Sequence, residues 1–534
     1  MSKDPSSEFA SEPAAEFAGS ATSGVGAIGA NDTRFFGHPL GLSNLFFTEL
    51  FERASYYGMR ALLILYMTAQ TVDGGLGYDV GTSALVYGLY TSLAYLANLP
   101  GGWIADRLLG QRRSVLLGGI LIALGHFTMA FDLIAAFYAG LGLIIMGTGM
   151  LKPNISVMVG QLYSAEDARR DAGFTIFYMG INIGAFAAPL ICGALAVNYG
   201  WHYGFAAAGV GMTLGVIVYV LTGKQLGDIG RLTAEAEAEK AESTSMFVKG
   251  LVGVLVLFGG LAALMVAGVI PSTPGVIQGI YIVLLLSITL GLFGWLLTRP
   301  YWTDGERKRL YMIILLFAGY AIFLAAFEQA GSSLNLFAEQ STDRTLGEWL
   351  QWIPGLENGT MIPAAWFQSL NAFFIFTIAP FVAMIWVALG RRGKDPSTAS
   401  KFGMGLVLLG LGFVTMVGAG LVSADGGQAS PWWLVLTYLF HTLGELTLSP
   451  VGLSATTKLA PTRVSSLMMG VWFLGASVGN FIAGSIAGFY DKLELPSFMG
   501  LVAAIAIIAG IGFFFLAGPM KRMMARAERA EAAP

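Results

Sequence analysis

Cysteine and charge are both scarce in this sequence. Cys192 is the single cysteine among 534 residues, so an intramolecular disulfide is excluded. Only 12% of the residues are charged, whereas 55% are hydrophobic and the mean hydropathy is +0.68. Apolar side chains therefore far outnumber what a soluble core needs. The composition predicts an integral protein of the lipid bilayer, and the net charge of −3 indicates no nucleic-acid partner.

Motifs for catalysis are missing as well. A metal enzyme needs a cluster of histidines or carboxylates such as H-E-x-x-H, and a serine protease needs a nucleophile with a base in reach. The sequence contains neither pattern. Its four histidines fall near segment ends or at unmatched positions: His38, His126, His202 and His441. We therefore predict no catalytic residue, no metal site and no cofactor, and a protein that is not an enzyme.

Hydrophobic stretches of about 20 residues recur along the chain, and this length crosses a bilayer as an α-helix. Glycine is frequent, at 71 of 534 residues, and small residues let membrane helices approach closely. A barrel would instead show alternating segments of about ten residues. We predict an all-α polytopic membrane protein with about fourteen transmembrane helices, at 40–71, 80–105, 113–131, 134–160, 172–197, 204–222, 246–268, 276–298, 309–331, 366–390, 402–422, 432–456, 465–488 and 498–518.

Lysine and arginine are unevenly distributed between these segments, and this predicts the orientation. Basic loops such as DRLLGQRRS and GRRGKDPSTASK alternate with loops such as VDGGLGYD, so the positive-inside rule makes both termini cytoplasmic. Only Arg344 and Lys492 are expected outside.

The predicted transmembrane segments form groups of six, two and six along the chain. The predicted parts are a disordered cytoplasmic tail (1–38), an N-terminal six-helix bundle (39–222), a cytoplasmic linker with a short helix (223–245), an accessory helix pair (246–298), a C-terminal six-helix bundle (299–518) and a cytoplasmic tail (519–534).

The first predicted span carries charges that lipid would not tolerate. Its stretch ELFERASYYGMR gathers six polar residues on one helical face: Glu49, Glu52, Arg53, Tyr56, Tyr57 and Arg60. Such a stripe must face the interior of a bundle or a watery cavity. The mixed charges and the tyrosines favour a cavity that binds a ligand and moves protons, with Glu49 and Glu52 as proton carriers. The alternative is a structural ion-pair zipper between packed helices.

The stretch GGWIADRLLGQRR resembles the loop between the second and third helices of the major facilitator superfamily. Four residues carry the pattern: Gly102, Asp106, Arg107 and Arg112. An aspartate at a helix end can bond backbone N–H groups or arginines of a neighbouring helix, so we predict that this loop stabilises one conformation. Alternatively, its arginines simply obey the positive-inside rule.

Further stretches resemble one branch of that superfamily. The pattern E-x-x-E-R-x-x-Y-Y-G, Glu49–Gly58, and FYMGINIGAF, Phe177–Phe186, are similar to signatures of the proton-dependent oligopeptide transporter family. FEQAGSSLNLF from Phe327 and GELTLSPVGL from Gly444 extend the resemblance over nearly the whole chain after residue 38. It implies the major facilitator fold, with two six-helix bundles plus two accessory helices. It also implies proton-coupled import of di- and tripeptides across the cell inner membrane by alternating access, driven by the proton gradient.

The resemblance assigns roles to charged residues inside the membrane. Lys152 is placed in the central cavity, although snorkelling to the interface is the alternative. Glu328 is expected to pair with Arg53 across the bundle interface. Glu445 is expected to meet the amino terminus of the peptide or, in an empty site, Lys152. The implied proton-coupling residues are Glu49, Glu52, Arg53, Lys152, Glu328 and Glu445.

Polar and aromatic residues in both halves are candidates for contacts with the peptide. Asn182 can bond a peptide backbone or merely the next helix, and Trp472 is a pocket wall or a packing residue. Leu324 stands where many family members have tryptophan, which implies a wider, more aliphatic side-chain pocket. The predicted peptide-binding residues are Arg53, Tyr56, Tyr57, Arg60, Tyr95, Lys152, Tyr178, Asn182, Leu324, Phe327, Glu445, Ser449 and Trp472.

Two other functions fit the same fold. One is proton-coupled transport of nitrate or another small anion, and the other is drug/proton antiport. An anion carrier would tolerate loss of the E-x-x-E-R carboxylates, and both are present here. Their presence favours the peptide symporter.

Overall fold

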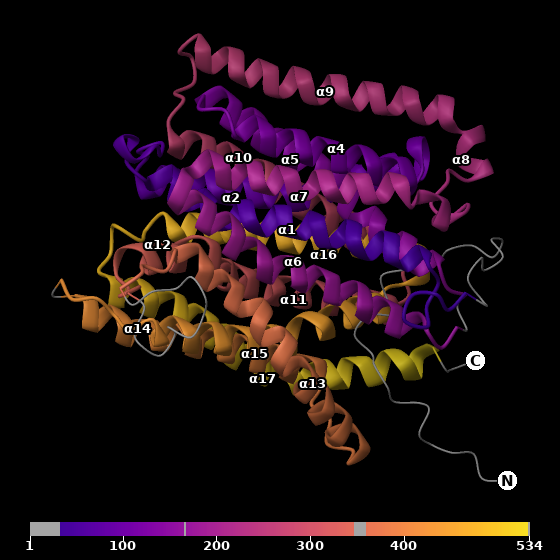
Figure 1. Ribbon diagram of the computed structural model, residues 1–534. Coiled ribbons are helices and arrows are strands. Elements are labelled where there is room, and N and C mark those ends of the chain that lie inside the picture. Colours follow the sequence, from indigo (N-terminus) through magenta and orange to yellow (C-terminus); the bar gives the residue numbers. More distant parts are fainter. Residues whose placement is uncertain (1–31, 165–166, 346–358, 425, 532–534) are drawn as a thin grey trace.

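Long helices make up most of the computed structural model, which describes residues 32–164, 167–345, 359–424 and 426–531 (Figure 1). Each of the fourteen predicted apolar segments coincides with a helix. The first half contains α1 (Gly41–Thr68), α2 (Val80–Leu96), α3 (Asn98–Ile104), α4 (Gln111–Met129), α5 (Ile134–Gln161), α6 (Arg170–Tyr199) and α7 (Trp201–Leu221). The rest contains α8 (Ala234–Ala238), α9 (Lys240–Val266), α10 (Pro274–Thr298), α11 (Asp304–Phe327), α12 (Ser333–Gln340), α13 (Ser369–Arg391), α14 (Thr398–Ser423), α15 (Trp432–Leu459), α16 (Ser465–Ala487) and α17 (Leu495–Glu531).

Apolar composition explains why these helices form a membrane bundle. Among the described residues, ten helical segments are long and apolar enough to cross a membrane. α2 has only 17 residues, but α3 and a π-helical turn, η3 (Ala105–Leu109), extend it. The all-helical polytopic architecture predicted from the sequence is confirmed.

The helices form two halves that lie side by side (Figure 1). In the N-terminal half, α1 packs against α6 and α7, and α4 against α5. In the C-terminal half, α14 packs against α15 and α17, and α11 against α16. The halves meet where α2 packs against α16 and α6 against α13. This arrangement is the major facilitator architecture of two bundles.

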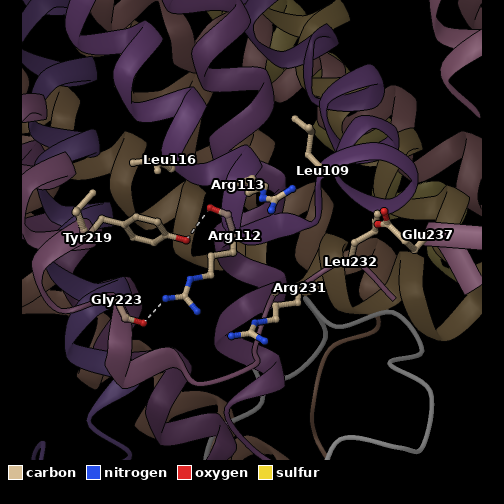
Figure 2. A pocket seen from close by; sticks show the side chains of 11 residues that line it. Leu109, Arg112, Arg113, Leu116, Tyr219, Gly223, Arg231, Leu232 and Glu237 are labelled. Atoms are coloured by element: carbon tan, nitrogen blue, oxygen red, sulfur yellow. Dashed lines mark hydrogen bonds between the residues drawn. The ribbon is translucent and has the colours of Figure 1, made fainter. Parts of the chain in front are cut away.

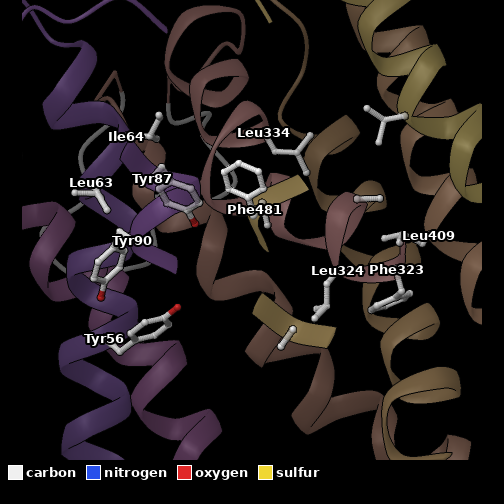
Figure 3. Close-up of a cluster of buried hydrophobic side chains, with 14 of the residues drawn as sticks. Tyr56, Leu63, Ile64, Tyr87, Tyr90, Phe323, Leu324, Leu334, Leu409 and Phe481 are labelled. Carbon is white, nitrogen blue, oxygen red and sulfur yellow. The ribbon is translucent and has the colours of Figure 1, made fainter. Parts of the chain in front are cut away.

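Hydrophobic packing continues across the boundary between the halves. One buried cluster contains residues of both, including Tyr56 and Tyr87 from the first and Leu324 and Phe481 from the second. Figure 3 shows the tyrosines of α1 and α2 on one side of this cluster and the side chains of the C-terminal half on the other. The boundary is therefore largely apolar, and the few polar contacts within it stand out.

At one end of the bundle the two halves are joined by hydrogen bonds. Asn335 of α12 donates to the carbonyl of Ala61 at 2.8 Å, and Trp366 of the 3-10 turn η7 (Ala364–Gln368) donates to the carbonyl of Leu190 at 3.0 Å. We call this the α12 end. At the opposite end, which we call the α8 end, α3 contacts α16, but among the described residues no extensive packing joins α5 to α15 or α16. The halves are closed against each other at the α12 end.

The accessory helices differ in how they are packed. α9 lies outermost in Figure 1, and its apolar window is not buried. α10 buries one face, made of Tyr281, Leu285, Thr289, Phe293 and Leu296. It contacts α2 of the first half and α11 of the second. Only α10 therefore reaches the boundary between the halves.

Some of the predicted part boundaries differ from the structure. Residues 1–31 of the expected disordered tail lie outside the described residues, but 32–38 contact the bundle: Arg169 donates to the Asp32 carbonyl at 3.0 Å, and His38 Nδ1 lies 2.9 Å from the Tyr163 hydroxyl. The linker contains the short helix α8, as predicted. α9 begins within the predicted linker and α17 continues to Glu531 within the predicted tail. The division into six parts otherwise stays a prediction.

Glycines allow the closest approach of α2 and α16. A Cβ added to Gly484 would lie 2.5 Å from the Cα of Gly88, and one added to Gly88 would lie 2.8 Å from the Cα of Gly484. These neighbours are backbone atoms, so they cannot rotate away as a flexible side chain could. The contact requires two helices without side chains at this level.

We expect Gly484→Ala to destabilise the protein, although alanine is intrinsically better than glycine in a helix by about 1 kcal/mol. The added methyl group must push α2 away, and overpacking of this kind typically destabilises by about 1–3 kcal/mol. The measurement is the thermal unfolding temperature in detergent. The matched control is Gly260→Ala in α9, where nothing lies within 4 Å of the added atom. Equal unfolding temperatures for the two variants would contradict the close contact.

Candidate functional site

The polar stripe of α1 lies inside the protein, as the helical spacing predicts. Glu49, Glu52, Arg53 and Arg60 are all at most 5% exposed. The Arg53 guanidinium lies 3.3 Å from Glu49 and donates to both carboxylate oxygens of Glu52. One arginine thus balances two carboxylates on the same helix. The second oxygen of Glu49 is buried and accepts no hydrogen bond from the described residues.

An ion pair links α1 to the other half. Arg60 lies 2.6 Å from Glu328, the first residue of the 3-10 turn η5 (Glu328–Gly331), and both side chains are 6% exposed. Its Nε atom also donates to the Tyr87 hydroxyl at 2.7 Å. The expected partner of Glu328 was Arg53, and that pairing is wrong in this conformation. Arg53 is already held by the two glutamates of its own helix, whereas Arg60 lies nearer the α12 end, where η5 reaches α1.

Lys152 faces the same interior. Its ammonium group lies 4.2 Å from the centre of the Tyr95 ring, at a distance typical of a cation–π contact. Glu49, Glu52, Arg53 and Glu328 are its charged neighbours. Among the described residues, no carboxylate lies within ion-pair distance of Lys152. Its predicted pairing with Glu445 is not formed here, and its predicted role in the central cavity stays a prediction.

Glu445 lies on α15, on the opposite side of the interior. It accepts a hydrogen bond at 2.9 Å from Asn371 of α13, and Asn371 also donates to Thr442 at 3.1 Å. Glu328 and Arg60 are among its charged neighbours, and Glu445 is in turn a neighbour of the Tyr178 hydroxyl on α6. The carboxylate of Glu445 therefore faces residues of both halves.

Three further residues predicted to contact the peptide, two tyrosines of α1 and an asparagine of α6, have contacts of their own. Tyr56 and Tyr57 lie under the guanidinium groups of Arg53 and Arg60, at 5.1 and 5.9 Å. Asn182 is buried, donates to the carbonyl of Tyr178 at 3.0 Å and also has a side-chain hydrogen bond with the Tyr178 hydroxyl.

On the C-terminal side, aromatic rings form the wall. Trp472 is 8% exposed and stacks on Tyr320, with ring centres 3.8 Å apart. Phe327 stacks on Phe323 at 5.4 Å. Leu324 is buried near them, and Ser449 is half-buried one helical turn from Glu445.

Three residues of this site were not predicted. Asn371, Tyr87 and Tyr320 each contact a predicted residue. Asn371 could have been found, because it is a polar residue early in the apolar segment 366–390, as Asn182 is in its own segment. No sequence signal distinguishes the two tyrosines from the other tyrosines of the chain.

The loop motif lies apart from this interior, at the α8 end. Arg112 donates to the carbonyls of Gly223 and Gly227, at 2.5 and 2.9 Å, and the Tyr219 hydroxyl donates to its carbonyl at 3.0 Å. Figure 2 shows the contacts of Arg112 with Gly223 and Tyr219 in a pocket between the start of α4, the end of α7 and the linker. They attach the linker to the first half.

The other members of the motif make contacts nearby. Asp106 accepts from Gln111 at 3.0 Å, Arg107 pairs with Glu239 just before α9, and Gly102 has free space around it. No residue of the second half is among these partners in the described chain. The role of the loop as a stabiliser of one conformation stays a prediction.

Among the residues that the structure describes, no three His, Cys, Asp or Glu side chains lie close enough together to hold a metal ion. What converges instead is a set of paired charges, amides and aromatic rings, which suits binding of a charged organic molecule.

Comparison with known proteins identifies the family. The model of the POT family matches residues 112–249 and 302–501. The peptide transporter YePEPT of Yersinia enterocolitica subsp. palearctica is 40% identical over 507 residues, covering 92% of this chain and 96% of that protein. The di-/tripeptide transporter of Lactococcus lactis subsp. cremoris is 37% identical over 503 residues, covering 93% and 99%. The uncharacterized transporter YclF of Bacillus subtilis is 42% identical over 499 residues, covering 92% and 96%.

Solved structures agree with this result. A crystal structure of a peptide transporter POT in complex with sulfate matches with a TM-score of 0.83 at 40% identity, covering 92% of this chain and 96% of that one. A POT family transporter in complex with 5-aminolevulinic acid matches with a TM-score of 0.81 at 34% identity, covering 91% and 98%. The signatures, the two-bundle fold and these matches agree: this chain belongs to the POT family of membrane transporters.

Proposed function

We propose that this protein is a symporter that imports di- and tripeptides together with protons across the cell inner membrane, by alternating access and without a cofactor. Relatives described as peptide or di-/tripeptide transporters, at 37–40% identity over most of the chain, support the choice of substrate. The observation that carries the proposal is the buried charge network of α1, because a transporter of neutral cargo alone would not need it.

The charges of the interior do not balance, and this supports proton binding. Four carboxyl groups lie there, those of Glu49, Glu52, Glu328 and Glu445, against the three basic groups of Arg53, Arg60 and Lys152. Burying an uncompensated charge is costly, so a proton on one carboxyl group is the simplest way to neutralise the set. The unbonded second oxygen of Glu49 offers a place for this proton.

The same charges suit the two ends of a peptide. Lys152 has no carboxylate within ion-pair distance among the described residues, so a peptide carboxylate can bind it without displacing a partner. Glu445, held by Asn371 on the opposite half, can accept the peptide ammonium group. Asn182 lies on the same helix as Tyr178, a neighbour of Glu445, and its side-chain amide can bond the peptide backbone when it exchanges its contact with Tyr178.

Peptide and proton binding are coupled in this arrangement. A peptide carboxylate that also engages Arg53 competes with Glu49 and Glu52 for the guanidinium. A displaced glutamate in a buried site must take up a proton to stay there. Because the peptide and the proton then occupy the interior together, they move in the same direction when the conformation changes.

The conformation supports alternating access. Positive-inside asymmetry makes the α8 end, with its basic loops, cytoplasmic and the α12 end extracellular. The halves are joined by hydrogen bonds at the α12 end, whereas at the α8 end the described residues show only a limited contact between α3 and α16, and this supports a state closed toward the outside. Release of cargo to the cell is the step that this conformation permits.

We expect Glu52→Gln, and also Glu49→Gln, to abolish proton-driven accumulation of dialanine while retaining downhill exchange. The amide keeps the shape of the carboxyl group but carries no exchangeable charge. Uptake by liposomes with an imposed pH gradient measures accumulation, and counterflow without a gradient measures exchange. The control is Glu235→Gln, an exposed residue of α8, which should leave both unchanged. Full accumulation by the α1 variants would refute proton coupling through α1.

Dipeptide analogues with a blocked amino or carboxyl terminus test whether the site binds both charged ends of the peptide. We expect N-acetylated and C-amidated dialanine to compete at least tenfold less well than dialanine, because each leaves a buried charge of the site unpaired. Glu445→Gln should weaken binding of dialanine while losing most discrimination against the N-acetylated form. If the N-acetylated analogue competes equally in the wild type, Glu445 does not bind the amine. Competition by nitrate or a lipophilic cation instead of dialanine would favour an anion carrier or a drug antiporter.

A further inference from the structure

A cluster of three buried hydroxyl groups joins the two halves and the accessory hairpin. Ser92 of α2 and Ser477 of α16 are both fully buried, and their hydroxyl oxygens lie 2.8 Å apart. Tyr281 of α10 is 6% exposed, and its hydroxyl lies 2.8 Å from that of Ser92. The cluster therefore contains one residue from each half and one from the accessory pair.

Counting donors assigns the direction of these bonds. Ser92 donates its single hydrogen to the Ser477 carbonyl at 2.7 Å, and Ser477 donates its hydrogen to the Ser92 carbonyl at 2.9 Å. Each serine hydroxyl has one hydrogen, so both are used. The hydroxyl of Tyr281 must then be the donor to Ser92. Without Tyr281, the Ser92 oxygen would have no donor left among these three residues.

Packing holds Tyr281 in this position. Its ring lies 4.8 Å from that of Phe481 on α16. One turn earlier on α10, Gln278 donates to the hydroxyl of Ser485 on α16 at 3.1 Å. Further along, the ring of Phe293 meets that of Phe317 on α11 at 5.0 Å. α10 is thus fixed to the C-terminal half along its length, while Tyr281 alone extends a hydrogen bond to α2.

The cluster lies on the line along which α2 and α16 touch. Ser92 is one helical turn from Gly88, and Ser477 is two turns from Gly484, the pair whose backbones meet. Reciprocal bonds from hydroxyl to carbonyl require the two backbones to stay close. Separation of the helices at the α12 end would lengthen these bonds and leave buried groups without partners.

We propose that Tyr281 is a positioning residue through which the accessory helix α10 holds α2 against α16, and so favours the conformation closed at the α12 end. α10 then acts as a clamp on the boundary between the halves, with its own anchor on α16 and α11. The hydrogen bonds of this clamp are made by neutral hydroxyl groups, so its effect does not depend on protons or on peptide. The inference rests on the alternating-access part of the proposed function but not on the identity of the cargo.

Cysteine accessibility tests this clamp. In a Cys192→Ala background the chain has no other cysteine. Ser83→Cys then introduces a reporter that is isosteric with the native side chain and fully buried on α2. It lies one turn from Tyr87, which bonds Arg60 at the boundary. A water-soluble maleimide can reach this thiol only when the α12 end opens, so the labelling rate reports the open population.

We expect Tyr281→Phe to raise the labelling rate about threefold to fivefold, as the loss of one buried hydrogen bond predicts. The rate is measured in nanodiscs without peptide and without a pH gradient, so failure of the clamp and failure of proton-coupled peptide transport are distinguishable. The matched control is Ser287→Ala, which removes an exposed hydroxyl from the same helix where it bonds only the Val283 carbonyl. This control should label at the parent rate.

A double-mutant cycle shows whether Tyr281 acts through Ser92. Ser92→Ala should accelerate labelling by itself, and Tyr281→Phe should then add nothing, because the acceptor of Tyr281 on α2 is gone and the remaining Ser477 lies on α16. Thermal unfolding of each variant separates opening from loss of fold. An unchanged labelling rate in folded Tyr281→Phe protein would overturn the clamp. An undiminished effect of Tyr281→Phe in the Ser92→Ala background would overturn its action through Ser92.

Discussion

The burial of four charged side chains on α1 is the constraint on which much of this structure depends. Lipid cannot solvate them, so every one needs a partner inside the bundle. Arg53 pairs with two glutamates of its own helix. Arg60, two turns further along, has no acid on α1 to pair with and takes Glu328 from the other half. The charge pattern of one helix thus requires a second bundle beside it.

This requirement also explains how a proton could control the contact between the halves. In the proposed cycle, opening the α12 end separates Arg60 from Glu328, which lie 2.6 Å apart in the closed arrangement. Leaving Glu328 charged and unpaired in the interior is costly. Protonation removes that cost, because a neutral carboxyl group needs only hydrogen bonds. Arg60 also donates to the Tyr87 hydroxyl, so it keeps one hydrogen-bond partner when its ion pair with Glu328 breaks.

The sequence predicted those features that follow from helical periodicity and from the cost of charge in lipid. The stripe of α1 and the fourteen helices are of this kind, whereas the central position of Lys152 was implied by the family resemblance. It did not predict which arginine meets Glu328, since Arg53 and Arg60 are seven residues apart and share one helical face. The two arginines differ in their positions along the axis of α1 relative to η5, and the position of η5 depends on the folded C-terminal half. Tyr281 was missed for the same reason, because its partners lie on two helices remote in sequence and a tyrosine in an apolar segment is most often a packing residue.

The polar contacts across the boundary between the halves, which include charged and neutral groups, differ in what can break them. The Arg60–Glu328 pair contains a group that protons can neutralise, so its strength depends on the proton supply. The hydroxyls of Ser92, Ser477 and Tyr281 have no charge to lose at physiological pH, and their bonds remain constant. A transporter needs both: if every contact were titratable, proton binding alone would open the α12 end without cargo. The hydroxyl groups and the glycine packing add a constant contribution to the free energy needed to open the α12 end. A proton and a peptide must then act together to shift the equilibrium between the closed and the open conformation. The accessory helix α10, which lies outside the two bundles, would then contribute through Tyr281 to the free energy needed to open the α12 end.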